Sequence, residues 1–427
     1  MHEKPWIKHY GPGVPLKIAA DHPFTVWSLV TDAISKYGES PAFSNYGADL
    51  SYSEIGRLSR DLASYLQNKL GLNKGDRVAA MLPNIMAFPV AMFANIQSGL
   101  IQVNVNPLYT PRELQHQLTD ADTETIIIFS GSTSVLAEIV NETNIKNVIV
   151  ANLGDCGNDT LPSPAIDERR SNVVSLMDAI NAGKSMVFTP VNILGDDLLF
   201  LQYTGGTTGL SKGAALTHRN LVANINQFTG LLSGKLRERE EIAITALPLY
   251  HIFALTVNCL IFFSIGGRNV LISNPRDMPA FVTELANWKF SVITGVNTLF
   301  NGLLHTPGFG DLDFSNLKLV GGGGTAIQEA ISNKWYQVTG LHITEGYGLS
   351  ETSPVVTFNV SSHDEFTGTI GIPVPSTDVV LRDESGKNVK QGEPGELCVK
   401  GQQVMHCLLY TSPSPRDRGC SRMPSSA

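Results

Sequence analysis

The sequence predicts an α/β protein with a mainly parallel sheet. Apolar runs of strand length alternate with stretches of helical periodicity, and this alternation is typical of βαβ units. Hydrophobic residues make up 42% and charged residues 16% of the 427 residues, the composition of a globular protein with a large core. At about 150 residues per domain, this length predicts two or three domains.

The first half of the chain predicts one α/β lobe, which we place at residues 1–195. Apolar residues at helical spacing predict helical structure from Trp27 to Leu70. Residues 155–170 are polar and contain two prolines, which indicates a surface loop. The other elements expected here are strands at 77–82, 101–105, 124–129 and 147–150 and helices at 88–99 and 111–118.

The same alternation resumes at Asp197 and predicts a second lobe of similar size over residues 196–375. Residues 252–267 form the longest apolar stretch; a bilayer span needs about 20 residues, so we expect a buried helix. Residues 376–405 have antiparallel character and predict the start of a β-barrel. The other elements expected in the second lobe are strands at 198–203, 270–272, 292–294 and 317–320 and a helix at 221–232.

Charge and cysteine usage exclude several classes of protein. The formal charge is −8 and no lysine or arginine run occurs, which argues against a nucleic-acid partner. The five cysteines include no CxxC pair, which argues against a zinc site and favours a reducing compartment such as the cytoplasm. The N-terminus has no apolar region typical of a secretory signal.

The segment Tyr203–Gly213, YTGGTTGLSKG, has the composition of a phosphate-binding loop. It follows a predicted strand and precedes a predicted helix, and its glycines allow several backbone N–H groups to face one anion. It is not a Walker A loop, because Ser211 rather than glycine precedes Lys212. A surface loop without a ligand is the alternative. The candidate donors are Thr204, Gly205, Gly206, Thr207, Thr208, Gly209 and Lys212.

The segment Glu345–Thr352 combines an aromatic ring with a carboxylate. Glycines flank Tyr347, so its ring could stack on a base without crowding. A carboxylate such as Glu351 beside phosphates requires a cation between them, for which Mg²⁺ is the simplest candidate. The alternative is a helix N-terminus capped by Ser350.

Two further segments are candidates for ligand binding. Four glycines, Gly321–Gly324, follow a predicted strand and allow close approach of a ligand, although a tight turn explains them as well. Their partial match to a dinucleotide fingerprint occurs too late in the chain to open a βαβ pair. His251 lies in Leu247–Phe253 at the entrance to the apolar helix, where a core histidine with satisfied hydrogen bonds is the alternative.

Together these segments resemble the adenylate-forming, or AMP-binding, superfamily. Residues 203–213 resemble its phosphate loop, residues 345–352 its adenine and magnesium motif, and residues 247–253 its histidine motif. The resemblance runs from Trp6 to Met405. It is greatest to the bacterial long-chain fatty-acid–CoA ligases, through residues 104–113, 294–300 and 371–376.

The resemblance implies a fold and a two-step reaction. The fold is the large N-terminal domain of these enzymes, two similar α/β lobes followed by a β-barrel. A fatty-acid carboxylate attacks the α-phosphorus of ATP to give acyl-AMP and pyrophosphate, and CoA thiolate then displaces AMP. Mg²⁺, a lysine and amide dipoles offset the repulsion between the two anions.

The resemblance also implies roles for individual residues. The catalytic residues would be Lys212, His251 and Glu351, with Mg²⁺ held by Thr204 and Glu351 and with His251 near the acyl carboxylate and the thiol entrance. The acyl chain would lie in an apolar tunnel near Gly295, Val296, Thr298 and Gly322. The AMP site would be lined by Gly323, Glu345, Gly346, Tyr347, Gly348 and Ser350.

The end of the chain departs from the family pattern. The Tyr-x-x-Gly-Asp ribose motif does not follow Met405, and the small C-terminal domain is missing, so we expect an incomplete chain with impaired acyl-CoA synthesis. Residues 406–427 break off the resemblance, and residues 407–417 can be back-translated to a sequence that resembles a transposon-end adapter. We therefore expect a tail that is not native.

Some properties stay open at this point. A ligase for a medium-chain or aryl carboxylate is an alternative to the long-chain enzyme, and a non-catalytic nucleotide- or acyl-binding fragment is another. The polar loop at residues 155–170 is shorter than in close relatives, which often carry a basic and apolar stretch nearby. Peripheral contact with the inner face of a membrane and oligomer formation are therefore left open.

Overall fold

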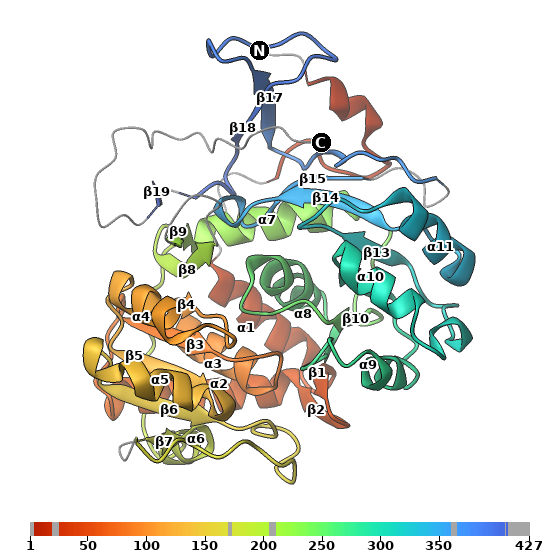
Figure 1. Cartoon of the computed structure of the whole chain (residues 1–427). Helices are drawn as coiled ribbons and strands as arrows, with labels where there is room; N and C mark the ends of the chain where they lie inside the picture. Colours follow the sequence, from red (N-terminus) through yellow and green to blue (C-terminus); the bar gives the residue numbers. More distant parts are fainter. Residues whose placement is uncertain are drawn as a thin grey trace.

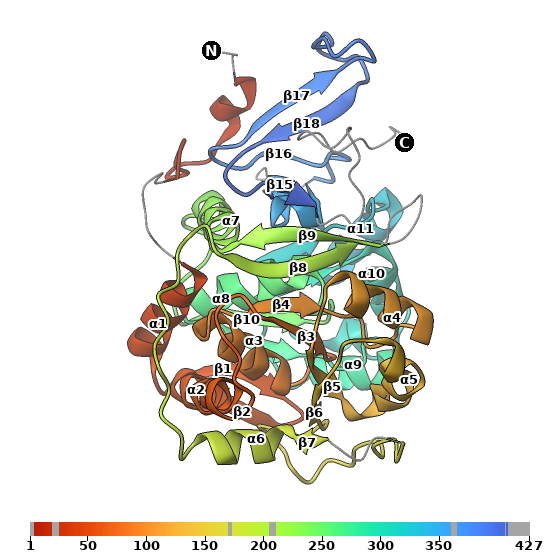
Figure 2. The same cartoon turned by 90° about the vertical axis from the view of Figure 1, so that its left-hand side faces the viewer.

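The computed structural model describes residues 4–18, 25–169, 173–204, 211–359 and 365–405, and the backbone of 407–408. Within these ranges the chain forms two large mixed sheets, each packed with helices, and one two-stranded sheet (Figures 1 and 2). We call the part built on the eight-stranded sheet the first lobe and the part built on the nine-stranded sheet the second lobe. The predicted α/β class with two lobes is confirmed.

The sheet of the first lobe has the strand order β19-β9-β8-β4-β3-β5-β6-β7. Strands β3 to β8 pair in parallel, and β9 and β19 add to one edge as antiparallel strands. The bounds are β3 (Arg77–Met81), β4 (Ile101–Asn104), β5 (Thr125–Phe129), β6 (Asn147–Ala151), β7 (Val174–Ser175), β8 (Leu198–Thr204), β9 (Lys212–Thr217) and β19 (Cys407–Leu408).

The sheet of the second lobe has the order β16-β15-β14-β13-β12-β10-β11-β1-β2. Its centre is parallel, and both edges end in antiparallel strands. The bounds are β1 (Pro41–Asn45), β2 (Ala48–Ser51), β10 (Ile242–Thr245), β11 (Arg268–Leu271), β12 (Val292–Gly295), β13 (Leu319–Gly322), β14 (Thr344–Gly348), β15 (Val355–Phe358) and β16 (Ile372–Pro373).

The helices pack around and between these sheets. The helix α3 (Ala87–Gln97) contains no charged residue and is buried at every position, as expected for a helix inside a core. The longer helices besides α3 are α1 (Val26–Tyr37), α2 (Tyr52–Asn68), α4 (Pro111–Asp120), α5 (Thr133–Ile139), α6 (Leu176–Gly183), α7 (His218–Leu231), α9 (Met278–Leu285), α10 (Asn297–Leu304) and α11 (Glu329–Thr339). The short ones are η1 (Pro5–His9), η2 (Ser130–Ser132), η3 (Val140–Glu142), η5 (Phe309–Asp311) and η6 (Ser350–Thr352).

The long apolar stretch is a buried helix, as predicted. It forms a π-helical segment at Ala254–Leu260 and continues as α8 (Ile261–Ser264). The Phe263 ring centroid lies 4.8 Å from that of Phe93 and 4.4 Å from that of Tyr52, so α8 packs on α3 and α2. Within the described part of the chain, no helix combines the length and the apolar character that crossing a bilayer requires.

The prediction of helical structure from Trp27 to Leu70 holds for α1 and α2 but is wrong between them. The hairpin β1–β2 separates α1 from α2, and its two turn residues, Tyr46 and Gly47, have φ angles of 48° and 76°. Two left-handed residues are typical of a tight β-hairpin turn. The hairpin is held in the second lobe, because β1 pairs in parallel with β11.

The division between the sheets does not fall at residue 195, where the sequence analysis placed it. The strands β8 and β9 extend the sheet of residues 77–151, while β1 and β2 belong to the sheet of the second lobe. The last part of the chain follows the expectation of antiparallel structure in residues 376–405. There β17 (Asp378–Arg382) and β18 (Glu396–Lys400) form a hairpin that projects from the two lobes (Figure 2).

Candidate active site

The glycine- and threonine-rich segment connects two antiparallel strands. Thr204 at the end of β8 pairs with Lys212 at the start of β9, and Tyr203 pairs with Gly213. The helix α7 begins only at His218, after β9, so the predicted order of strand, loop and helix is wrong. The predicted donors Gly205, Gly206, Thr207, Thr208 and Gly209 lie outside the described residues.

The base of this hairpin is held by α4. The hydroxyl of Tyr203 donates to Asp120 Oδ2 at 2.6 Å, and His116 Nε2 lies 3.0 Å from the carbonyl oxygen of Ser211. Gly213 relieves crowding here, because a Cβ atom would lie 3.0 Å from the ring of Tyr203. These supports were not predicted, because Asp120 and His116 lie more than 80 residues before the hairpin in the sequence.

The segment that carries His251 is fixed by residues of the first lobe. Asn84 Nδ2 donates to the carbonyl oxygens of Thr245 and Leu247, both at 2.9 Å. Gln202 Nε2, two residues before Thr204, donates to Tyr250 O at 2.9 Å. The strand β8 and the segment of His251 are therefore joined directly.

Gln202 is the last member of a chain of buried amides. Asn95 Nδ2 donates to Gln102 Oε1 at 3.0 Å, and Gln102 Nε2 donates to Asn104 Oδ1 at 2.7 Å. Asn104 Nδ2 then donates to Gln202 Oε1 at 3.0 Å. Because Gln102, Asn104 and Gln202 each accept one of these hydrogen bonds and donate the next, the chain fixes the direction in which Gln202 faces Tyr250.

His251 is exposed at the entrance to the apolar helix, so the alternative of a core histidine is wrong. Its Nδ1 accepts the backbone N–H of Phe253 at 3.3 Å, which leaves the proton of the neutral ring on Nε2. Desolvation by the surrounding protein lowers the pKa of His251. The ring is therefore neutral at pH 7 and presents Nε2–H as a donor.

Three of the candidate segments, residues 321–324, 345–352 and 247–253, meet at one point. A Cβ atom on Gly323 would lie 3.2 Å from both the carbonyl oxygen of Gly346 and the ring of Phe253. The strands β13 and β14 run in parallel and place Gly322 opposite Glu345. A side chain at position 323 would crowd both neighbours, so glycine suits this close approach, and three segments that were predicted separately from the sequence are neighbours.

Glu345 and Tyr347 of β14 differ in their freedom to contact a ligand. Glu345 is buried, and its Oε1 accepts the N–H of Ile327 at 2.8 Å. Burial raises the pKa of this carboxyl group. Tyr347 is half-buried; burial and then the nearby Glu351 carboxylate raise the pKa of its hydroxyl.

Glu351 lies in a tight turn between two antiparallel strands. Residues 350–352 form η6, and β15 follows, so the alternative of a helix N-terminus capped by Ser350 is wrong. The hydroxyl of Thr352 accepts the N–H of Leu349 at 3.0 Å and donates to Pro354 O at 2.5 Å. The turn packs against β8 and β9, which brings Glu351 onto an element adjacent to Thr204.

These donors fit a magnesium ion bound together with a nucleotide. Mg²⁺ prefers oxygen ligands, and at nucleotide sites it usually takes one or two from the protein and the rest from phosphates and water. Glu351 offers a carboxylate that is partly exposed, and Thr204 offers a hydroxyl that is also partly exposed. In the described ranges no three or more His, Cys, Asp or Glu side chains gather into a metal cluster.

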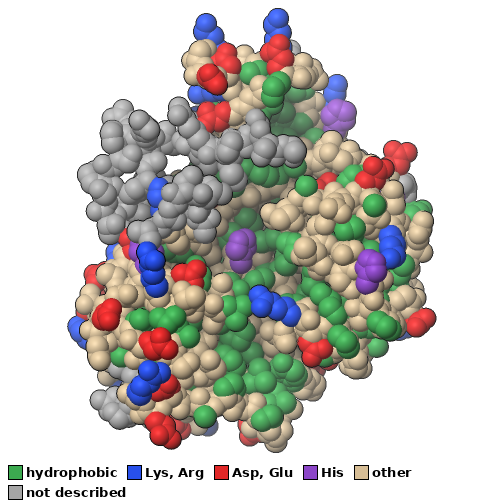
Figure 3. All heavy atoms as spheres, in the orientation of Figure 1, with side chains coloured by type: hydrophobic (Ala, Val, Ile, Leu, Met, Phe, Trp, Pro, Cys, Tyr) green, Lys and Arg blue, Asp and Glu red, His purple; other side chains and the backbone are tan. Residues whose placement is uncertain are grey.

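The residues predicted to line an acyl tunnel lie at the end of β12 and the start of α10. Gly295 is buried and pairs with Gly322, Val296 is partly buried, and Thr298 is exposed. Gly322 is closely packed, because a Cβ atom there would lie 2.8 Å from Ile327 and Ile343. Figure 3 shows hydrophobic side chains gathered along the boundary between the two lobes.

A family profile described as AMP-binding enzyme matches residues 30–409, a range that includes every segment of this site. The chain belongs to the AMP-binding enzyme family. A long-chain-fatty-acid–CoA ligase of Yersinia pestis is 45% identical over 414 residues, which cover 94% of this chain and 74% of the relative. The ligase of the same description from Bacillus subtilis is 31% identical, with 94% and 73% covered.

Solved structures of CoA ligases have the same fold. An anthranilate CoA ligase in complex with anthranoyl-AMP superposes with a TM-score of 0.82 at 18% identity, covering 93% of this chain and 72% of that one. A long-chain-fatty-acid–CoA ligase from Archaeoglobus fulgidus gives a TM-score of 0.80 at 22% identity, with 97% and 83% covered. The fold expected from the resemblance, that of the N-terminal domain of adenylate-forming enzymes, is confirmed.

Proposed function

We propose that this AMP-binding enzyme is a long-chain fatty-acid–CoA ligase that activates its substrate with ATP through acyl-AMP. The observation that carries the proposal is the meeting of Gly323, Gly346 and Phe253 at one point. This proximity supports an AMP site on β14 beside the segment of His251. The relatives at 45% identity that bear this description support the choice of substrate.

The first step brings a carboxylate to a triphosphate, and the site must offset the repulsion between them. Lys212 is exposed at the base of the β8–β9 hairpin, where its charge and the hairpin amides can contact phosphates. Thr204 and Glu351 would hold Mg²⁺, which neutralises phosphate charge when it is bound. The Nε2–H group of His251 can donate to a carboxylate oxygen and orient it.

The adenylate would lie against β14. Tyr347 offers a ring face between two glycines, and Gly346 leaves room for a ligand to approach the backbone. Glu345 would support this surface without contacting the ligand, since its carboxyl group already accepts the N–H of Ile327. We therefore assign Glu345 to shaping the AMP site, with Gly348 and Ser350 forming the turn beyond it.

The site would be reached from the cytoplasm. Among the described residues Cys156 and Cys259 are free thiols, which agrees with a reducing compartment. ATP, CoA and a fatty acid are the substrates that the proposal requires.

Binding and turnover together test the proposal. Isothermal titration should show ATP binding that is tighter with Mg²⁺ present. A thioester assay with palmitate, ATP and CoA should show product at a low rate, because the chain spans 74% of the length of its relative and impaired acyl-CoA synthesis is expected. Binding of ATP by a chain that forms neither acyl-AMP nor thioester would favour the non-catalytic alternative. Absence of magnesium-dependent ATP binding would contradict the proposal altogether.

Chain length of the acid distinguishes the long-chain enzyme from a medium-chain or aryl ligase. Each CH₂ group that becomes buried contributes about 0.8 kcal/mol, so affinity should rise steadily from octanoate to palmitate. Displacement of a bound fluorescent fatty acid by each of these acids measures this trend. An affinity that stays constant or falls beyond octanoate would favour the medium-chain ligase. A higher affinity for benzoate than for the fatty acids would favour the aryl ligase.

A further inference from the structure

The helix α7 presents a row of amide side chains to the protein interior. Asn220, Asn224 and Gln227 are spaced four and three residues apart and therefore share one face of the helix. We call these three residues the α7 amide face. They are 7%, 0% and 0% exposed, and buried amides are costly unless their hydrogen bonds are made.

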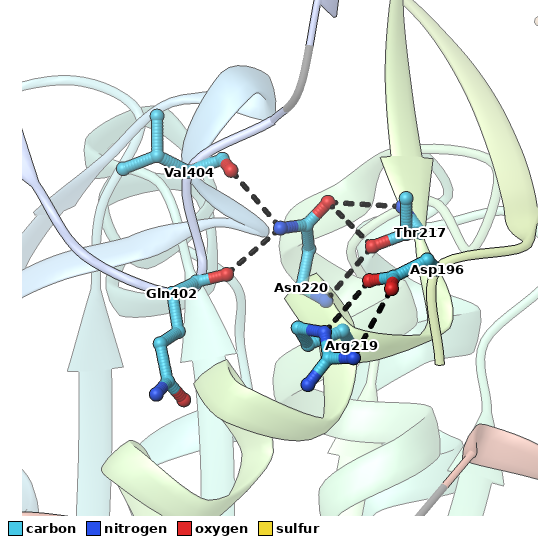
Figure 4. A network of polar contacts seen from close by, with 6 residues as sticks. All are labelled: Asp196, Thr217, Arg219, Asn220, Gln402 and Val404. Atoms are coloured by element: carbon cyan, nitrogen blue, oxygen red, sulfur yellow. Dashed lines mark hydrogen bonds and ion pairs between the residues drawn. The ribbon is translucent and has the colours of Figure 1, made fainter. Parts of the chain in front are cut away.

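Asn220 joins the start of α7 to a segment far along the chain (Figure 4). Its Oδ1 accepts the backbone N–H of Thr217 at 3.0 Å and the hydroxyl of Thr217 at 2.9 Å, which caps the helix. Its Nδ2 donates to the carbonyl oxygens of Gln402 and Val404, at 2.8 and 2.9 Å. The amide oxygen of Asn220 therefore caps α7, and its amide nitrogen donates hydrogen bonds to residues 402–404.

The other two members of the α7 amide face hold the same region. Asn224 exchanges two hydrogen bonds with Val355, the first residue of β15, at 2.8 and 3.0 Å. Gln227 Nε2 donates to Gln403 Oε1 at 2.9 Å. The α7 amide face thus contacts the chain both just after the turn of Glu351 and at residues 402–404.

Residues 403–405 in turn hold the turn of Glu351. The N–H of Met405 donates to the carbonyl oxygen of Glu351 at 2.7 Å. The hydroxyl of Ser353, which is fully buried, donates to the carbonyl oxygen of Gln403 at 2.9 Å. Hydrogen bonds therefore connect Asn220 to the backbone of Glu351 through a single short segment.

We propose that Asn220 is a positioning residue for the magnesium site, acting on Glu351 through residues 402–405. The role of Glu351 as a magnesium ligand rests on the proposed function, whereas the hydrogen-bonded path does not. A carboxylate close to phosphates binds a cation well only if its position is fixed, and outer partners commonly supply that constraint. Asn220 supplies it from an element that the sequence places over 130 residues away from Glu351.

Asn220→Asp separates the two functions of this amide. The variant keeps an oxygen for the cap of α7 but replaces the Nδ2 donor with an oxygen that faces two carbonyl groups. Thr217→Ala is the matched control, since it removes the cap hydroxyl, a partner of Asn220 Oδ1, and keeps the Nδ2 donor that faces Gln402 and Val404. Ser353→Ala is a second, milder variant that removes one link of the path.

Two measurements on the whole chain are combined. In Asn220→Asp, hydrogen exchange of the amides in residues 351–355 and 402–405 should quicken about tenfold or more. The gain in ATP affinity on adding Mg²⁺ should fall about tenfold, the usual size of an outer-partner effect. Ser353→Ala should show both effects to a smaller extent, and Thr217→Ala neither. In a Glu351→Gln background, Asn220→Asp should no longer change the magnesium dependence.

The outcomes separate the inference from the proposed function. Unchanged exchange in Asn220→Asp and Ser353→Ala, or an equal loss of magnesium dependence in Thr217→Ala, would overturn the inference. So would quickened exchange with an unaltered magnesium dependence. Lack of any magnesium-dependent ATP binding by the unmodified chain contradicts the proposed function alone, and the exchange measurement then still decides whether Asn220 positions the turn.

Discussion

The two turns that carry the candidate chemistry occupy equivalent places in the two sheets. In the first lobe, β8 is parallel to β4 and antiparallel to β9, and the glycine-rich segment joins β8 to β9. In the second lobe, β14 is parallel to β13 and antiparallel to β15, and the turn of Glu351 joins β14 to β15. Both turns lie where a parallel sheet changes to antiparallel pairing.

The turns differ in how they are held. Side chains from α4 support the base of the β8–β9 hairpin, through Tyr203 and Ser211. Backbone packing closes the other turn, where a Cβ atom on Gly348 would lie 2.1 Å from Pro354 O. A phosphate needs several amide donors, which a glycine-rich segment supplies, whereas a cation site needs one carboxylate in a fixed position.

Glycine substitutions should give the largest contrast between the two turns. Gly348→Ala places a methyl group 2.1 Å from a backbone oxygen, so β14 and β15 must separate. We expect a loss of more than about 3 kcal/mol in the free energy of unfolding. Gly213→Ala meets only the Tyr203 ring, at 3.0 Å, and should cost about 1 kcal/mol. Urea denaturation measures both, and equal losses would contradict the comparison.

Removal of the carboxylate at the second turn should affect metal binding more than stability. Glu351→Gln is expected to reduce the magnesium-dependent part of ATP affinity about a hundredfold, since one charged contact to the cation is lost. Titration of ATP with and without Mg²⁺ measures this part. Glu329→Gln, an exposed position in the first turn of α11, is the control and should leave it unchanged. If the magnesium dependence of ATP affinity is unaltered in Glu351→Gln, Glu351 is not a ligand of the metal.

The two regions should respond to pH with opposite sign. His218, which follows β9, is buried and accepts the N–H of Val26 on Nδ1 at 3.2 Å; burial lowers its pKa from 6.5 to about 4. As the pH falls, His218 therefore takes up a proton at a higher pH in the unfolded chain than in the folded chain. The free energy of unfolding should fall as the pH drops below 6.5, by about 2 kcal/mol between pH 7 and pH 5. His218→Asn should remove this loss.

Glu345 at the second turn provides the opposite case. Burial raises the pKa of its carboxyl group above the ordinary value of 4.5. Its contribution to stability is therefore full below that value and is lost as the pH rises through the raised pKa. Glu345→Gln should make stability less sensitive to pH in this range. Unfolding curves for both variants across pH 4–7 test the two directions of pH dependence. If the free energy of unfolding changes equally with pH in His218→Asn and in the unmodified chain, the prediction for His218 is wrong.

The smallest expected effect concerns the support of the hairpin base. Tyr203→Phe removes the hydroxyl that donates to Asp120 at 2.6 Å and should cost about 1 kcal/mol in the free energy of unfolding. A double-mutant cycle with Asp120→Asn isolates the pair. If the two substitutions add without coupling, this hydrogen bond does not hold the hairpin.

Much of the fold was predictable because its signals are local. The buried parallel strands, such as Arg77–Met81 and Thr125–Phe129, are short apolar runs with few alternatives. The helix at Pro111 has a threonine cap and a proline in its first turn, and it begins as predicted. The glycine, hydroxyl and carboxylate composition of the ligand-binding segments was visible for the same reason.

The errors concern strands whose pairing comes from elsewhere in the chain. The strand β9 has the sequence KGAALT, which has low β propensity, and it forms because β8 lies beside it. The hairpin of β1 and β2 lies between two helices in sequence but joins β11, more than 200 residues later. No local pattern predicts such partners.

The sequence by itself determined the chemical groups available and the family to which the chain belongs. Only the tertiary structure decided which sheet each strand joins, that Gly323 and Gly346 meet beside Phe253, and that Asn220 reaches Val404. Propensity and periodicity act over a few neighbouring residues, whereas strand pairing and buried amide contacts depend on groups that are distant in the chain. The supports of both turns are of this second kind.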